Sequence, residues 1–218
     1  MMEYPLITLY ESLYKSFGPQ HWWPARTKFE IIAGAILTQQ TTWKNVEKAI
    51  ENLRKEHLLS VKNLGEAPLR KIEKLVRPVG YYRQKSKHLK GVSAYLLKHC
   101  RGDLNKFFRK ETKTLRKELL MLRGIGKETA DSILLYAGEK RVFVIDAYTR
   151  RVLQRLNLLV ENDYDKIRRF FEKNLPKDIK IYREFHALLV KLGKEFCKRK
   201  PLCQSCPVLK EGLCPGKL

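Results

Sequence analysis

Four cysteines lie close together near the C-terminus of the chain, in the stretch CKRKPLCQSCPVLKEGLC. They are Cys197, Cys203, Cys206 and Cys214, and the remaining cysteine of the chain is Cys100. Four thiolates complete the coordination of a tetrahedral zinc ion and equally that of an iron–sulfur cluster, so the spacing predicts a metal site without selecting the metal. A disulfide pair is the alternative for these four, and Cys100 is expected to be a small buried apolar residue.

Two glycines one residue apart, Gly124 and Gly126, separate two helical patterns in LMLRGIGKETADSILLYA. Glycine lets the backbone turn sharply and approach a ligand, because no Cβ stands in the way. The second helix then begins with free amides and the positive end of its dipole directed outward, an arrangement that favours a phosphate. The alternative is a plain turn between two helices.

One acidic residue, Asp146, ends the apolar run RVFVI and begins the basic pattern AYTRRVLQRL, eighteen residues after Glu128. Aspartate is a favoured N-cap, and a capping carboxylate accepts backbone N–H bonds that keep it ionised. An ionised carboxylate is also the group that stabilises a positively charged sugar. We therefore predict that Asp146 is an N-cap and a candidate catalytic residue.

The elements that position these residues are predicted to be helices. Apolar residues recur at intervals of three and four through most of the chain, for example in FEIIAGAILTQ, NVEKAIENLRK and REFHALLVKLGKEF. The only strand-like run is RVFVI, and glycine and proline interrupt the helices in FGPQHWWP, LGEAP, VRPVGYY and NLPKD. The pattern indicates an all-α protein with many helices of ordinary length.

The chain has 218 residues and is strongly basic, with 45 Lys and Arg against 23 Asp and Glu, a formal charge of 45 − 23 = +22. This charge is spread along the chain and predicts salt-sensitive binding to DNA or RNA, although an anionic membrane surface or a ribosome would also fit. No apolar run approaches a membrane-spanning length, and the N-terminus lacks the layout of a signal peptide. We expect a cytoplasmic protein with reduced cysteines.

The hairpin, Asp146 and the cysteine stretch, in this order, resemble the helix-hairpin-helix DNA glycosylases of base-excision repair, in particular the endonuclease III branch. The resemblance covers nearly the whole chain and implies a [4Fe–4S] cluster on the four cysteines. The spacing departs from the family, since C-x5-C-x2-C-x7-C stands here where the family usually has C-x6-C-x2-C-x5-C. The total span is similar, so the resemblance supports cluster binding more than it supports the details of the loop.

The resemblance also implies the domains and the DNA contacts. It predicts a helical barrel domain over residues 21–137, a second helical domain from residues 1–20 and 138–218 that carries the cluster, and an active-site cleft between them. In GAILTQQTTW, Gln40 would fill the space left by an extruded base, and in VRPVGYYRQKSKHL, Tyr81 would wedge into the opposite strand. A solvated glutamine and a packed tyrosine are the alternatives. The hairpin residues expected to grip DNA are Gly124, Gly126, Lys127 and Thr129.

A lysine that the family uses for strand cleavage is missing here. Members with lyase activity carry it two residues after the second glycine, as the amine that attacks the sugar C1′, and this chain has Glu128 at that position. Lys127 is adjacent, but one residue turns a helix by about 100°, so its amine leaves from another face. The resemblance thus implies a glycosylase without efficient lyase activity, in which Asp146 acts on water.

The tryptophans Trp22, Trp23 and Trp43 all lie in HWWPARTKFEIIAGAILTQQTTW. A cationic base is attracted to an indole face, so these residues are candidates for a pocket that reads an alkylated purine; three packed core tryptophans are the alternative. Together with RPVGYYRQK and GIGKE, this stretch resembles the 3-methyladenine DNA glycosylase III group. A described member of that group lacks the cluster cysteines, whereas this chain keeps them.

Three functions remain open from the sequence. The first is a monofunctional glycosylase for cationic purines such as 3-methyladenine, and the second is an endonuclease III-like glycosylase and lyase for oxidised pyrimidines. The third is a DNA-binding module with an iron–sulfur cluster and no catalytic activity. In each case we expect a monomer that binds double-stranded DNA containing a damaged base, in the nucleoid of a prokaryotic cytoplasm. His21 and His186 are expected to be packed rather than to line the cleft.

Overall fold

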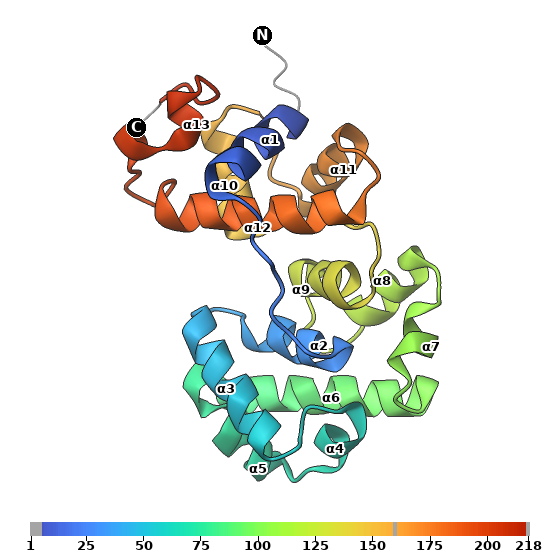
Figure 1. The fold of residues 1–218 in the computed structure, drawn as a ribbon. Helices are drawn as coiled ribbons and strands as arrows, with labels where there is room; N and C mark the ends of the chain where they lie inside the picture. The colour runs from blue at the N-terminus through green and yellow to red at the C-terminus, as the bar shows by residue number, and fades with distance from the viewer. Residues whose placement is uncertain (1–5, 159–160, 217–218) are drawn as a thin grey trace. The chain divides into compact units, whose positions relative to one another are not determined.

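The computed structural model describes residues 6–158 and 161–216, and Figure 1 shows their helices. None of these described residues lies in a β-strand, which confirms the all-α prediction. Within the same ranges, no helix is both long enough and apolar enough to cross a membrane. The chain forms two compact units, one made of Ala25–Lys140 and one made of Met1–Pro24 together with Arg141–Leu218.

The unit of residues 25–140 contains one contiguous stretch of helices. They are α2 (Lys28–Leu37), α3 (Trp43–Lys55), α4 (Val61–Glu66), α5 (Leu69–Leu75), a 3₁₀ turn (Arg77–Val79), α6 (Tyr82–Cys100), α7 (Leu104–Phe108), α8 (Thr112–Leu120), α9 (Lys127–Ser132) and a π-helical segment (Ile133–Ala137).

Helix α2 is the centre of this unit. Of its 10 residues, 8 are buried, as expected for a helix that is apolar on all sides. It packs against α3, α6, α9 and the π-helical segment. Thr27 caps its N-terminus by accepting the amide of Glu30, and the buried Glu30 carboxylate is paired with Arg54 at 2.6 Å. The end of α2 is thereby held at a fixed place in the core.

The second unit is built around α12. Its helices are α1 (Leu6–Phe17), α10 (Ala147–Arg155), α11 (Tyr164–Asn174), α12 (Ile179–Glu195), a 3₁₀ turn (Cys203–Ser205) and α13 (Pro207–Lys210). Helix α12 packs against both α1 and α10, as Figure 1 shows. Nine of the residues of α12 are buried, so it forms the apolar base on which the start of α10 rests.

The apolar run of residues 142–145, which leads into α10, is buried but is not a strand. Phe143 stacks on Phe171 with ring centroids 4.0 Å apart, and its ring also meets the edge of Tyr182. Side chains replace a sheet partner for the buried amides: Phe143 N donates to the Glu172 carboxylate at 3.1 Å and Ile145 N to the Tyr164 hydroxyl at 3.3 Å. The residue that follows this anchored segment is Asp146.

Candidate functional site

Asp146 lies at the N-terminus of α10 and is buried, with 9% of its surface exposed. Its Oδ1 accepts the backbone amide of Thr149 at 2.7 Å, which confirms the predicted N-cap. Its Oδ2 lies 3.6 Å from Nε2 of His186 on α12, an ion pair when the imidazole is protonated. Both carboxylate oxygens are thus directed at positive or partly positive groups.

The surroundings of Asp146 favour its ionised form. Burial alone raises the pKa of a carboxyl group, but His186 and the Thr149 amide outweigh this effect and hold the pKa of Asp146 below its usual value. A buried carboxylate that stays charged can orient water and stabilise a developing cation beside it. This arrangement provides the electrostatics that hydrolysis through a positively charged sugar requires.

His186 also supports an aromatic side chain. Its ring stacks on Trp22, with centroids 5.5 Å apart and planes at 24°. Trp23 lies beside Trp22 at a centroid distance of 6.1 Å, and the Lys194 ammonium lies 5.8 Å from the centre of the Trp22 ring. The indole of Trp22 is therefore near the Asp146–His186 pair and already attracts a cation. His186 is buried, as expected for a packed histidine, and it also contacts Asp146.

Nothing in the sequence indicated that His186 would lie beside Asp146. Helical periodicity places His186 on the buried face of α12, but the partner lies on a different helix. A single histidine on a buried helix face is usually a core residue, and no spacing rule links it to a distant aspartate. The contact arises because α10 and α12 pack against each other.

The glycine hairpin joins α8 to α9. Gly124 has φ +83, and a Cβ there would lie 2.1 Å from Nδ1 of His88, so glycine is required for both conformation and space. Gly126 is extended, caps α9, and has open space around it. Gln39 secures the turn, since its Nε2 donates to the carbonyl of Gly124 at 2.9 Å and to the Thr129 hydroxyl at 3.0 Å.

The first residues of α9 differ in exposure. Lys127 and Glu128 are exposed, whereas Thr129 is buried with 7% of its surface accessible. The Thr129 hydroxyl accepts from Gln39, which gives it a role in holding the hairpin. The exposed pair at the start of α9 thus consists of one amine, that of Lys127, and one carboxylate, that of Glu128.

Gln40 and Tyr81 are both exposed residues in left-handed backbone conformations. Gln40 has φ 51 and follows α2, and Tyr81 has φ 43, caps α6 and is 67% exposed. Such conformations are uncommon for non-glycine residues and occur where the fold holds them. Trp43 is the first residue of α3 and is partly buried. The neighbouring Gln39 contacts the hairpin, whereas Gln40 itself is exposed.

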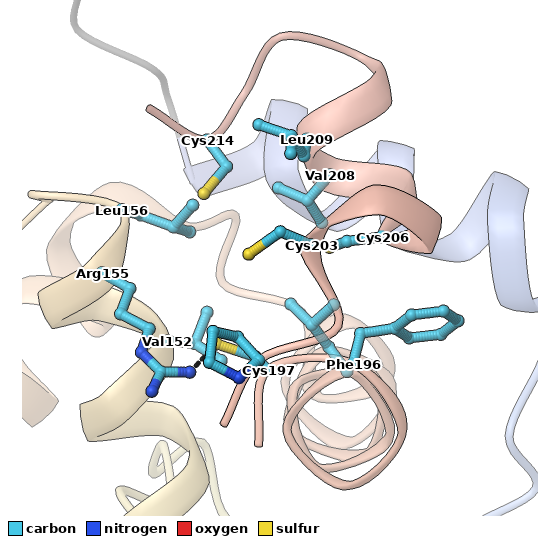
Figure 2. A pocket seen from close by; sticks show the side chains of 12 residues that line it. Val152, Arg155, Leu156, Phe196, Cys197, Cys203, Cys206, Val208, Leu209 and Cys214 are labelled. Atoms are coloured by element: carbon cyan, nitrogen blue, oxygen red, sulfur yellow. Dashed lines mark hydrogen bonds between the residues drawn. The ribbon is translucent and has the colours of Figure 1, made fainter. Parts of the chain in front are cut away.

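The four C-terminal cysteines surround one cavity, shown in Figure 2. Its other walls are mostly apolar side chains from α10, α12 and α13, such as Val152, Leu192 and Val208. Burial raises the pKa of the Cys214 thiol, the backbone amide of Gly216 works in the opposite direction, and the other three cysteines raise this pKa further. Four thiols facing a shared apolar space are chemically suited to an iron or zinc group.

Two arginines of α10 hold this cysteine loop. Arg155 donates to the Cys197 sulfur at 3.3 Å, the bond drawn in Figure 2, and to the carbonyl of Arg199 at 2.9 Å. Arg151 donates to the carbonyls of Cys197 at 2.6 Å and Gly193 at 2.9 Å. The helix that begins at Asp146 is therefore fixed at its other end to the first cysteine.

The arrangement of the cysteines bears on which metal group they fit. Among the described residues, no three His, Cys, Asp or Glu side chains are grouped to hold one metal ion. Each thiolate of a [4Fe–4S] cluster binds a different iron, so its four sulfurs lie further apart than the ligands of one zinc ion. Four thiols around a shared cavity are a donor set that either a zinc ion or an iron–sulfur cluster can take.

Comparison with known proteins identifies one family and relatives that are DNA repair proteins. A family model described as HhH-GPD superfamily base excision DNA repair protein matches residues 33–177. A predicted DNA repair glycosylase of Methanocaldococcus jannaschii is 48% identical over 203 residues, covering 92% of each chain.

Two solved structures share the fold over most of the chain. The H. pylori 3-methyladenine DNA glycosylase bound to 1,N6-ethenoadenine is 32% identical and has a TM-score of 0.76, covering 87% of this chain and 96% of that one. A trapped covalent intermediate of endonuclease III with DNA is 25% identical and has a TM-score of 0.82, covering 99% of this chain and 97% of that one.

Proposed function

The chain belongs to the HhH-GPD superfamily of base excision DNA repair proteins, and on this basis we propose that it is a monofunctional glycosylase for alkylated, positively charged purines such as 3-methyladenine. One observation carries the proposal: Asp146 is buried and held in its ionised form by His186 and Thr149. The absence of lyase activity is proposed from the family resemblance, which puts Glu128 at the position of the lyase lysine.

In the proposed reaction the C1′–N bond breaks and its electron pair stays with the base. A cationic purine leaves as a neutral molecule, so it needs no protonation. The Asp146 carboxylate stabilises the positive charge that develops on the sugar and orients a water molecule toward C1′. The water oxygen bonds to C1′ and its proton passes to Asp146, which leaves an abasic site and the free base as products.

The preference for alkylated purines is supported by Trp22 and by a relative. A flipped base is commonly read by stacking, and an electron-rich indole attracts a cation. Trp22 lies over His186 beside Asp146, and its ring already attracts the Lys194 ammonium. The structure of the 32% identical H. pylori protein is that of a 3-methyladenine glycosylase with a modified adenine bound. Trp23 and Trp43 are proposed to complete the base pocket.

The remaining proposed sites follow the same resemblance. The hairpin residues Gly124, Gly126, Lys127 and Thr129 are proposed to grip a DNA phosphate, with the positive end of α9 assisting. Gln40 and Tyr81 are proposed to enter the duplex around the extruded base. We further propose that the four cysteines bind a [4Fe–4S] cluster, which would tie the C-terminal loop to the chain that leaves α12 at Cys197.

Base release from methylated and from oxidised DNA, measured side by side with and without alkali, tests the function. The proposal predicts free 3-methyladenine from methylated DNA, strand breaks only after alkali, and no complex trapped by borohydride. Release of oxidised pyrimidines with direct strand breaks would instead support the endonuclease III-like function, which the similarity to a covalent endonuclease III intermediate favours. Tight, salt-sensitive binding without any release would identify a non-catalytic DNA-binding module.

A further inference from the structure

Lys85, on the first turn of α6, is a buried lysine whose ammonium joins two separate segments. Only 3% of the residue is exposed. Its Nζ donates to the carbonyl of Leu37 at 3.0 Å and to the carbonyl of Val79 at 2.9 Å. Burial lowers the pKa of Lys85 to about 8, and no carboxylate among the described residues contributes to that shift.

The two carbonyls belong to the ends of two helices. Leu37 is the last residue of α2, and Val79 is the last residue of the 3₁₀ turn of residues 77–79. The final carbonyls of a helix lack partners within the helix and carry the negative end of its dipole. A single ammonium therefore caps two helix ends, at the cost of burying a charge that an apolar side chain would avoid.

The segments that follow these two carbonyls contain Gln40 and Tyr81, two exposed residues with left-handed backbones. Gln40, with φ 51, stands three positions after Leu37, and Gly80 and Tyr81, with φ 65 and 43, follow Val79 directly. Left-handed conformations of non-glycine residues persist only where the surroundings hold them in place. Lys85 bonds to the carbonyl from which each of these segments starts, and it thereby connects the two segments.

We propose that Lys85 is a positioning residue that holds the segments of Gln40 and Tyr81 in one joint arrangement, so that both side chains enter damaged DNA together. This inference rests on the proposed function, because it takes Gln40 and Tyr81 as the residues that enter the duplex. Lys85 itself touches neither the substrate nor the reacting atoms. Its effect is on geometry, and small misplacements of positioned groups reduce rates by about 100-fold.

The chain offers a matched control in Lys90. This lysine lies on the same helix and also caps helix-end carbonyls, since its Nζ donates to Gly65 at 3.0 Å and to Ala67. Those carbonyls belong to the end of α4, and neither Gln40 nor Tyr81 lies in the segment that follows them. Lys85→Met and Lys90→Met each remove one capping ammonium from α6. A difference in behaviour between the two variants is therefore due to the particular carbonyls that Lys85 caps, and not to the general loss of a cap.

The DNA experiment uses a duplex with an abasic-site analogue opposite 2-aminopurine, whose fluorescence rises when the base is unstacked. We expect wild type and Lys90→Met to raise the fluorescence and Lys85→Met to raise it little, while affinity for undamaged duplex changes by less than about twofold in both variants. Tyr81→Ala should abolish most of the effect of Lys85→Met, because the lysine acts through that side chain. Equal signals from Lys85→Met and Lys90→Met, or fully additive losses with Tyr81→Ala, would overturn the proposal.

An experiment without DNA separates this inference from the proposed function. Amide hydrogen exchange of residues 38–41 and 79–82 should accelerate together, by about tenfold, in Lys85→Met and stay unchanged in Lys90→Met. Unchanged exchange in Lys85→Met would overturn the proposal even if the enzyme releases 3-methyladenine. If the wild type releases no base, the proposed function fails, and the exchange rates still decide whether Lys85 holds the two segments.

Should Lys85→Met fail to fold, a mutant cycle on the exposed residues keeps the question open to test. Gln40→Ala and Tyr81→Ala change only exposed side chains. If the two residues are held as one unit, the double variant should lose less 2-aminopurine signal than the two separate losses combined. Independent, additive losses would show that the two segments act separately and would overturn the proposal.

Discussion

His186 and Asp146 face each other from two packed helices, with Nε2 of the histidine 3.6 Å from Oδ2 of the aspartate, and the same imidazole stacks on Trp22. One side chain thus contacts both the candidate catalytic carboxylate and the candidate base-stacking residue. The charge of Asp146 and the placement of Trp22 consequently depend on a common support, and changes at His186 should affect both.

The first prediction concerns the carboxylate itself. Asn caps a helix about as well as Asp, so Asp146→Asn should preserve the bond from the Thr149 amide and change the free energy of unfolding little. It removes the negative charge, so base release should fall by about 100-fold or more. Single-turnover excision together with DNA-binding affinity measures the two effects. Full activity in a folded Asp146→Asn variant would contradict the assignment.

The second prediction uses His186→Phe, which keeps a ring beside Trp22 and removes the ring nitrogen that lies 3.6 Å from the Asp146 carboxylate. Without that partner, burial raises the pKa of Asp146, so the activity of the variant should decline at a higher pH than that of wild type as the solution is acidified. We expect kcat/KM at neutral pH to fall by about tenfold.

The lowered pKa of Asp146 also predicts how the stability of this variant depends on pH. A carboxyl group whose pKa is lowered by folding stabilises the folded state at pH values above its pKa in the unfolded chain. This stabilisation is lost as the pH falls through the pKa of the folded state. His186→Phe should lack this contribution of Asp146. His99→Phe is a matched control, because His99 stacks on Tyr95 at a centroid distance of 4.2 Å in the other unit. Identical pH profiles for wild type and His186→Phe would show that the histidine does not act on Asp146.

The third prediction restores the missing amine. Glu128 lies in the first turn of α9 and is exposed, so a lysine there can be accommodated, at a loss of about 0.3–1 kcal/mol from an unfavourable charge at the helix N-terminus. Glu128→Lys should form a complex with DNA that borohydride traps, and it should cut the strand without alkali. Glu128→Gln is the control and should do neither. If borohydride trapped the wild type as efficiently as Glu128→Lys, another amine of the wild type would already attack the sugar C1′.

The sequence predicted the helical class, the Asp146 cap and the need for glycine at position 124, because each depends on local chemistry. The N-cap is a short-range hydrogen bond, and glycine at φ +83 is a local requirement. The run RVFVI has the residue types of a strand, but a strand needs a partner, and here the buried amides of Phe143 and Ile145 bond to side chains instead.

Contacts between distant residues were beyond the reach of sequence patterns. His186 is 186 − 146 = 40 residues from Asp146, and no period connects them. Gln39 and Gln40 are identical in type, and only packing of α2 against α9 decides which one contacts Gly124. Lys85 stands in a basic stretch that reads as solvent-exposed, yet it is buried because two helix ends supply carbonyl partners.

The last prediction addresses the cysteine loop. If the four cysteines bind a cluster, the purified protein should be brown and contain iron and sulfide in equal amounts, with no stoichiometric zinc. Cys206→Ala should lose the colour and the iron. Its free energy of unfolding should fall by about 2 kcal/mol or more, because a bound metal group stabilises the fold that holds it.

Cys100→Ala provides the control for these measurements. Cys100 is also buried, but it lies on α6, and its thiol donates to the carbonyl of Leu96 at 3.0 Å. The variant should keep the colour, the iron and the sulfide, since this thiol is not one of those around the cavity. A colourless wild type with one tightly bound zinc would reverse the metal assignment. Equal iron in Cys206→Ala and wild type would exclude this cysteine as a ligand.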